Sequence, residues 1–275
     1  VNKWIISSTV KLNESVSDSI ENFRFNDAAS QLYQFIWGTF CDWYLELIKP
    51  MLNSENDSLK QESRLTAAWT LSQILHFLHP IMPFITEEIW ERIDFSKNTL
   101  LINSKWPEQD NSLFNITAEA EIAWVIKLIS QIRGVRSEVN VPAASLIKMI
   151  IRDSSSETMG RIKSHDAIIC RLARLESIQI DKGNSKISVG SAQIILDETL
   201  IILPLAEVID FNVEKERLNK ELKKADTEIT KLEEKLSNSD FLTRAPEDVV
   251  QEQRQKLDTF KDVKERICIA INRLV

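Results

Sequence analysis

Cationic side chains recur at helical spacing near the end of the sequence, where they could bind the phosphates of a nucleic acid. At 100° per residue they fall within a sector of about 60°, well away from an apolar seam. Glutamates lie one turn before three of the lysines, an arrangement that stabilises an exposed helix without any ligand. RNA backbone contact and a solvated helix flank are therefore equally good interpretations. The stripe consists of Arg217, Lys220, Lys224, Lys231 and Lys235.

Arg133 and Arg136 lie on the apolar face of a helix predicted over residues 117–139. Burying an unpaired guanidinium costs several kcal/mol, so both side chains are expected to meet carboxylates or phosphates. The slightly favoured interpretation is an ion pair with Glu138, Glu87 or a domain outside these 275 residues. RNA backbone is the alternative.

Lys3 and Trp4 are a second combination of a basic and an aromatic residue, and we expect them to precede the first helix. At that place Trp4 has no periodic apolar stripe to join. It could stack on an unpaired base while Lys3 binds a phosphate. The alternative, a tryptophan that only packs against the start of the helix, is equally well supported.

Two other groups could suggest chemistry but have simpler interpretations. His76 and His79 have a spacing that can hold a metal, but no third ligand lies nearby. The adjacent Glu87 and Glu88 point in different directions on a helix, which does not suit paired acid/base catalysis. We interpret the histidines as packed side chains and the glutamates as solvated or ion-paired, so neither a metal site nor a catalytic residue is expected.

The elements that must position these residues begin with a helix predicted over residues 26–49. Asn26 is expected to cap this helix and Pro50 to end it. Its apolar residues form two adjacent stripes that cover about half of the circumference, so the helix should lie centrally in a bundle. We interpret its aromatic residues as core rather than as stacking platforms for bases. They are Trp37, Phe40, Trp43 and Tyr44.

The rest of the chain predicts a mainly α fold in three parts. Residues 1–142 form a helical bundle, 143–210 a small α/β module, and 211–275 an antiparallel coiled-coil hairpin with apolar residues at alternating spacings of 4 and 3. Further bundle helices are expected over residues 4–23, 58–79, 85–93 and 117–139. In the module we expect strands at 146–152, 177–180, 186–189, 192–196 and 200–203, with a helix at 157–172.

Composition is that of a soluble globular protein, with 43% hydrophobic and 27% charged residues. The net charge of −7 argues against a nucleic-acid partner, but residues 211–275 carry 14 Lys+Arg and 14 Asp+Glu, so the acidity lies upstream. Three widely separated cysteines favour buried or incidental thiols over disulfides or zinc. No apolar run approaches the length of a membrane span and no signal peptide opens the sequence, so we expect a cytoplasmic protein. The start at Val1, without a methionine, suggests a fragment of something longer.

Six motifs follow one another along residues 23–257. They read FRFNDAASQLYQFIWGTFCDWYLELIKP, HPIMPFITEEIW, SKWP, IRGVRSEVNVP, CRLARLESI and FLTRAPEDVVQEQRQKL. Together they resemble the C-terminal part of bacterial valyl-tRNA synthetases. The first two motifs are shared in looser form with the isoleucyl and leucyl enzymes, whereas the last two resemble the valyl enzyme specifically.

This resemblance implies an anticodon-binding bundle, a junction module and an arm that touches the outer corner of the tRNA. It places Lys3 and Trp4 at the anticodon-loop surface. The HIGH and KMSKS motifs of the catalytic domain occur nowhere in the sequence. The expected role is therefore to hold tRNA(Val) for upstream catalytic and editing domains, which would use ATP and Mg, while these 275 residues bind no cofactor and do not catalyse charging.

Two alternatives stay open. The first is the anticodon-binding part of an isoleucyl- or leucyl-type synthetase, although an isoleucyl enzyme would be expected to end in a cysteine-rich zinc site for which this sequence has no ligands. The second is a structural coiled-coil module that mediates oligomerisation. Helices that pair with each other leave the protein monomeric, which is the expected state, whereas an open seam would produce dimers.

Overall fold

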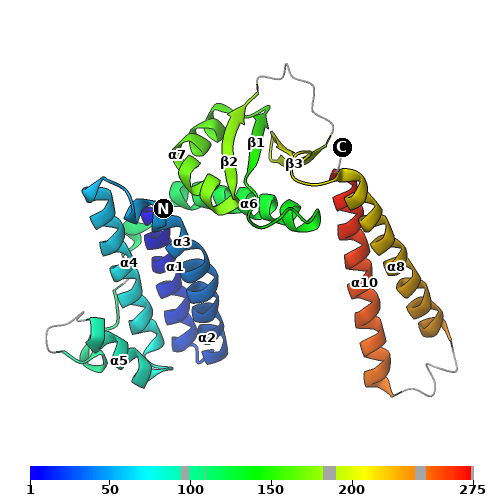
Figure 1. Ribbon diagram of the computed structural model, residues 1–275. Helices are drawn as coiled ribbons and strands as arrows, with labels where there is room; N and C mark the ends of the chain where they lie inside the picture. Colours follow the sequence, from blue (N-terminus) through cyan, green and yellow to red (C-terminus); the bar gives the residue numbers. More distant parts are fainter. Residues whose placement is uncertain (94–98, 109, 182–189, 239–245, 274–275) are drawn as a thin grey trace. The chain divides into compact units, whose positions relative to one another are not determined.

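The computed structural model of the protein describes residues 1–93, 99–108, 110–181, 190–238 and 246–273. They form two compact units, Val1–Ile126 and Lys127–Val275. The predicted fold class is confirmed, because helices predominate and a small sheet precedes a two-helix arm (Figure 1). The predicted division at residues 142 and 210 stays a prediction. Among the described residues, no helix combines the length and apolar composition that crossing a membrane requires.

The first unit is a bundle in which the helical rods of residues 2–21, 25–52 and 57–78 alternate in direction (Figure 1). The predicted helices are present, with ends within about three residues of the expected positions. Its α-helices are α1 (Asn2–Glu21), α2 (Phe25–Gln34), α3 (Leu45–Leu52), α4 (Asp57–Leu78), α5 (Pro83–Ile93) and the first part of α6 (Ile116–Glu138). Two short 3-10 helices, η2 (Leu101–Asn103) and η3 (Asn111–Leu113), lie between α5 and α6.

The central helix of the bundle differs from the prediction in its middle and at both ends. Between α2 and α3 the chain is a π-helix, η1 (Phe35–Tyr44), whose wider turn shifts every later side chain away from the position given by a 100° count. The predicted cap, Asn26, is wrong, since the helix begins at Phe25 after Arg24. Pro50 does not end the helix but lies in the last turn of α3, which continues to Leu52.

Trp106 ties α1 to α4 at one end of the bundle. Its indole Nε1 donates to the Ser17 hydroxyl at 2.9 Å, and its ring centroid lies 5.5 Å from that of Phe77. Because Ser17 is near the end of α1 and Phe77 near the end of α4, the two helices run in the same direction. The following links, α1 to α2 and α4 to α5, therefore leave the bundle at the same end.

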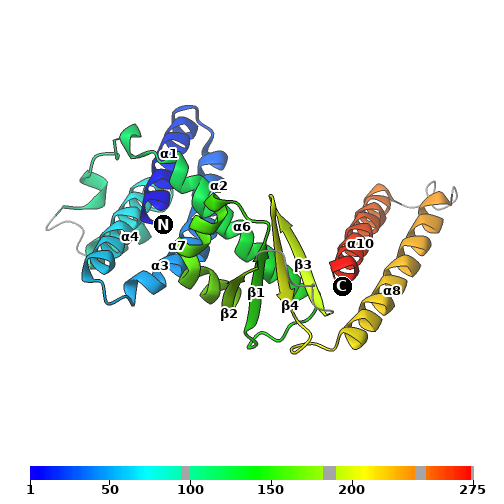
Figure 2. The same ribbon diagram turned by 90° about the horizontal axis from the view of Figure 1, so that it is seen from above.

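The second unit contains a four-stranded sheet in the order β2-β1-β4-β3. β1 (Ile147–Arg152) pairs in parallel with β2 (Leu175–Ile180) through the crossover helix α7 (Ser156–Ala173), and antiparallel with β4 (Thr199–Pro204). β3 (Ser191–Leu196) forms a hairpin with β4 (Figure 2). The predicted strand at 186–189 lies outside the described residues, and the other predicted strands are present.

The arm consists of α8 (Phe211–Ser237) and α10 (Glu247–Arg273), which lie side by side in Figures 1 and 2. The Asp210 carboxylate caps α8 by accepting from the backbone of Asn212 and Val213. The seam of α8 is buried as its spacing predicts, and two ion pairs cross between the helices. The buried apolar residues of α8 are Leu218, Ala225, Ile229 and Leu232, and the ion pairs are Lys264–Asp226 and Lys261–Glu233.

Gly190 permits the close approach of β3 to the start of the arm, and its replacement is the first prediction. Its φ is +90°, and an added Cβ would lie 2.8 Å from Ala206 Cβ and 3.4 Å from the Phe211 ring. Gly190→Ala should lower the free energy of unfolding by about 1–3 kcal/mol in urea denaturation, through strain and overpacking. Gly160 is the matched control, because it lies in α7 with open space around it. Gly160→Ala should raise stability by about 0.5–1 kcal/mol, and equal losses for the two variants would contradict the account.

Candidate nucleic-acid interface

The lysines of the predicted stripe lie on the open side of the arm. Lys220 and Lys224 are exposed and form no ion pair with any described residue. Lys231 pairs with Glu228 at 2.7 Å, and the Lys235 ammonium lies 3.3 Å from the Gln253 side chain. The stripe thus presents two uncompensated cations and two partly engaged ones, which suits the loose, sequence-independent binding of phosphates.

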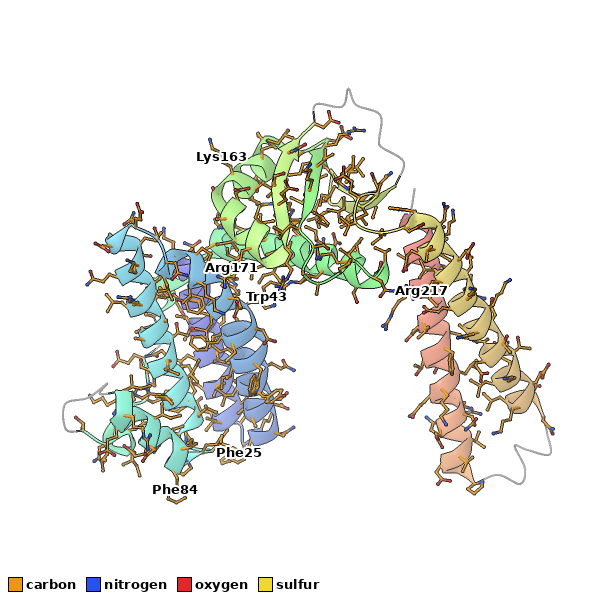
Figure 3. The ribbon with its side chains drawn as sticks, in the orientation of Figure 1. Phe25, Trp43, Phe84, Lys163, Arg171 and Arg217 are labelled. Atoms are coloured by element: carbon orange, nitrogen blue, oxygen red, sulfur yellow. The ribbon has the colours of Figure 1, made fainter. Side chains whose placement is uncertain are left out.

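Arg217 does not belong to this open stripe. Its Nε lies 2.9 Å from a Glu214 carboxylate oxygen, its Nη1 lies 2.5 Å from Glu221, and its Nη2 donates to the Glu138 carbonyl at 3.1 Å. The hydrogen bond to Glu214, followed by that to Glu221, raises the pKa of the guanidinium despite partial burial. All of this lies at the base of α8, next to the end of α6 (Figure 3). Arg217 therefore attaches the arm to the end of α6. Because two carboxylates already bind it, Arg217 is a weaker candidate for phosphate binding than the sequence suggested.

Backbone carbonyls accept from both Arg133 and Arg136. Arg133 Nε donates to the Leu172 carbonyl at 2.8 Å. Arg136 is 7% exposed and donates to the carbonyls of Arg174, Pro142 and Ser145 at 3.3, 3.1 and 2.8 Å. The expectation that Arg136 would need a carboxylate or phosphate is corrected, because three backbone carbonyls accept from it instead. Burial, followed by the charge of Arg174, lowers its pKa.

A cavity of about 370 Å³ opens beside these arginines. Arg133, Arg136 and Arg174 all line it, and no carboxylate is among its described lining residues. Arg174 reaches this place because it ends α7 in the left-handed region, with φ at 54°. An opening lined by three guanidinium groups can take an anionic group such as a phosphate. Sequence reasoning missed Arg174, whose contribution depends on an αL cap that no glycine or asparagine marks.

Trp4 is placed differently from the prediction, whereas Lys3 is exposed as expected. Both residues lie within the first turn of α1 and not before it, and Trp4 is only 7% exposed. The expected stacking face is therefore covered, and the alternative of a packed tryptophan fits the structure. Lys3 lines a cavity of about 250 Å³ together with Glu62 and Glu121, whose carboxylates would oppose a phosphate there.

The aromatic residues of the central helix include buried and exposed side chains. Phe40 and Tyr44 are buried and stack with ring centroids 5.7 Å apart, which agrees with the predicted core role. Trp37 is 57% exposed and lies 6.4 Å from the exposed ring of Tyr33, so its predicted core role is wrong. Tyr33 lies one turn earlier in the regular helix α2 and is 66% exposed, so this face of the central helix is open to solvent although its apolar spacing predicts burial.

The histidines and glutamates of the bundle serve the fold. The Glu87 carboxylate accepts from the backbone of Leu101 and Ile102 at 2.6 and 3.2 Å, and so caps η2. His76 contacts the Ser72 carbonyl, and His79 contacts the Thr86 hydroxyl. Within the described part of the chain, no cluster of three or more potential ligands is arranged to hold a metal ion.

Comparison with known proteins assigns these two helical regions. Residues 2–151 match the family model described as the anticodon-binding domain of tRNA ligase. The chain belongs to this family. Residues 210–275, which begin at the cap of α8, match the model described as the valyl tRNA synthetase tRNA binding arm. The resemblance drawn from the six sequence motifs is confirmed, and this member of the anticodon-binding family also carries the arm.

The similarity to curated relatives covers the whole of this chain. The whole chain is 42% identical to part of the valine–tRNA ligase of Caulobacter vibrioides, and 39% identical to parts of those of Mesorhizobium japonicum and Zymomonas mobilis. It spans about 30% of the length of each.

Trp4→Ala provides a direct test of the packing of this anticodon-binding bundle. Because Trp4 is buried in α1, we expect the change to lower the free energy of unfolding by about 3 kcal/mol or more, measured by urea denaturation. Lys3→Gln alters the exposed neighbour and serves as the control, with a change within about 0.5 kcal/mol. A Trp4→Ala protein of unchanged stability with weakened binding of a valine anticodon stem-loop would instead support base stacking.

Proposed function

We propose that these 275 residues are the tRNA-holding part of a valine–tRNA ligase. In this role they bind tRNA(Val) and present it to catalytic and editing domains elsewhere in the same longer protein. The observation that carries the proposal is that one chain matches both an anticodon-binding domain and a tRNA-binding arm, in that order. The full-length similarity to parts of valine–tRNA ligases supports valine as the amino acid.

In this proposal the aminoacylation reaction takes place in a catalytic domain outside these 275 residues. ATP and Mg would act in that catalytic domain. We also propose that the longer protein is a cytoplasmic monomer. Support for the monomer comes from the arm, in which α10 of the same chain already covers the apolar seam of α8.

The proposed RNA contacts lie mainly in residues 127–275. Residues 1–126 carry 9 Lys+Arg and 17 Asp+Glu, whereas residues 127–275 carry 25 and 24. Phosphate binding therefore favours the arm lysines and the cavity lined by Arg133, Arg136 and Arg174. In the acidic bundle, Lys3 is retained as a candidate contact at the anticodon side, and Trp4 acts there through packing.

Binding to purified tRNAs tests the proposal. The 275-residue chain should bind valine tRNA more tightly than a non-cognate elongator tRNA when both are measured by fluorescence anisotropy at the same salt concentration. Part of the affinity should be common to both, since phosphate contacts carry no sequence information. Equal affinity for the two tRNAs would remove the assignment to valine, and no binding to either would remove the assignment to tRNA.

The arm lysines generate a sharper prediction. Replacing Lys220, Lys224 and Lys231 together by Gln keeps helix propensity and the apolar seam while removing three positive charges. If all three bind phosphates, the slope of log K against log salt should become less steep by about 2–3 units. In the longer enzyme the KM for tRNA should rise while valine activation is unchanged.

A matched triple variant on the partner helix controls for charge. Lys256, Lys261 and Lys264 lie on α10 and each pairs with a carboxylate, at 2.6, 2.9 and 2.7 Å. Replacing these three by Gln removes the same charge from the same arm and should leave most of the salt slope intact. Similar flattening in both variants would show that the arm acts only through its net charge. An unchanged slope in the first variant would show that the stripe is a solvated flank.

A further inference from the structure

One end of the bundle exposes a cluster of large apolar side chains. Phe84 is 90% exposed, Phe23 81% and Phe25 57%, and three aliphatic side chains beside Phe84 are about half exposed. Large exposed apolar side chains gathered at one end of a domain mark an interaction site. We call it the apolar end patch, and it consists of Phe23, Phe25, Ile81, Met82, Phe84 and Ile85.

The patch draws on two links that the bundle brings to the same end. Trp106 contacts both Ser17 of α1 and Phe77 of α4, so these two residues lie at the same height along the bundle. Phe23 follows Ser17 by six positions, and Phe84 follows Phe77 by seven. Figure 3 shows Phe25 and Phe84 at this end, with Phe84 pointing away from the helices. Residues about 60 apart in sequence thus contribute to one apolar surface.

Both links hold their rings outward. Phe23 adopts a φ of 59°, and the Arg24 amide donates to the Ser19 carbonyl at 2.7 Å, which fixes the turn between α1 and α2. The Phe23 and Phe25 rings meet edge to face with centroids 6.3 Å apart. In the other link, the Met82 amide donates to the Leu78 carbonyl at 2.8 Å. The backbone turns that carry the patch are therefore fixed before any partner binds, which lowers the entropy cost of docking.

The charges around the patch favour a protein partner over RNA. Arg24 pairs with Asp18 and Asp27, and Arg92 pairs with Glu88 at 2.6 Å. Glu21 and Glu91 add further negative charge on the same segments. Surfaces that stack nucleic-acid bases also supply cations for the phosphates, whereas here the cations Arg24, Arg92 and Lys105 are outnumbered by carboxylates. These carboxylates are Asp18, Glu21, Asp27, Glu88 and Glu91.

We propose that the apolar end patch docks against a domain of the same polypeptide that lies outside these 275 residues. Because the chain spans about 30% of its valine–tRNA ligase relatives, some 70% of such a protein remains to cover the patch. This inference rests on the proposed function only in taking the longer protein to resemble those relatives. The contact would fix the bundle against the rest of the ligase through aromatic packing.

Photo-crosslinking in the complete gene product that contains this chain tests the proposal. Phe84→p-benzoylphenylalanine should, on irradiation, crosslink to a peptide of the same polypeptide outside the 275 residues, as identified by mass spectrometry. The same replacement at Leu65, which is 63% exposed on α4 and outside the patch, should give much less of this product. Crosslinks from position 84 to tRNA, to a second copy, or to nothing above the Leu65 control would each overturn the proposal.

Thermal unfolding supplies a second readout that does not depend on tRNA. Phe84→Ala should lower the unfolding midpoint of the complete gene product by about 2 °C or more and change that of the 275-residue chain much less. Leu65→Ala should have similar effects in both proteins, and the same pattern for Phe84→Ala would contradict docking. The affinity for valine tRNA, measured on the same samples, distinguishes failure of the docking proposal from failure of the proposed function. Loss of docking alone would not change the assignment to tRNA.

Discussion

Backbone carbonyls at the ends of helices lack donors within the helix, and in residues 127–275 arginine side chains supply them. Arg133 and Arg136 hold carbonyls at the end of α7, and Arg217 holds the carbonyl of Glu138 at the end of α6. Positive charge at a helix C-terminus is also favourable for the helix dipole. The sheet module and the arm are thus both attached to the last turns of α6 by guanidinium groups. Removing any one of them would leave a carbonyl without this donor as well as deleting a charge.

Sequence reasoning predicted those parts of the fold that depend on apolar periodicity. The seam of α8, the order of β1, α7 and β2 along the chain and the ends of α4 all follow from patterns that a regular α-helix or strand preserves. The prediction failed on one face of the central helix, where Tyr33 in α2 is exposed. Across the π-helix Phe35–Tyr44, a 100° count placed Trp37 in the core, although it is largely exposed. Pro50 was predicted to end this helix. A proline removes a single backbone donor, and α3 continues past it to Leu52.

The candidate site was predictable in its residue types but not in its contacts. Five cations on one face of α8 follow from spacing alone, yet only coordinates separate Arg217, held by Glu214 and Glu221, from the open Lys220 and Lys224. Likewise, the apolar setting of Arg136 could be inferred, but its partners are carbonyls of a loop whose path no pattern encodes. The division of charge between acidic residues 1–126 and the nearly neutral remainder was visible from sequence, and it restricts where phosphates can bind.

The arm also has a mechanical consequence that follows from its length and its anchoring. With 27 residues, α8 extends about 40 Å from its base, at a rise of about 1.5 Å per residue. It is attached at its base through Arg217 to Glu138 and through the close packing of Phe211 beside Gly190. A tilt of about 10° at the base would therefore displace the far end by about 7 Å. In the proposed function, small changes at the arginine anchor would therefore select which nucleotide the far end reaches.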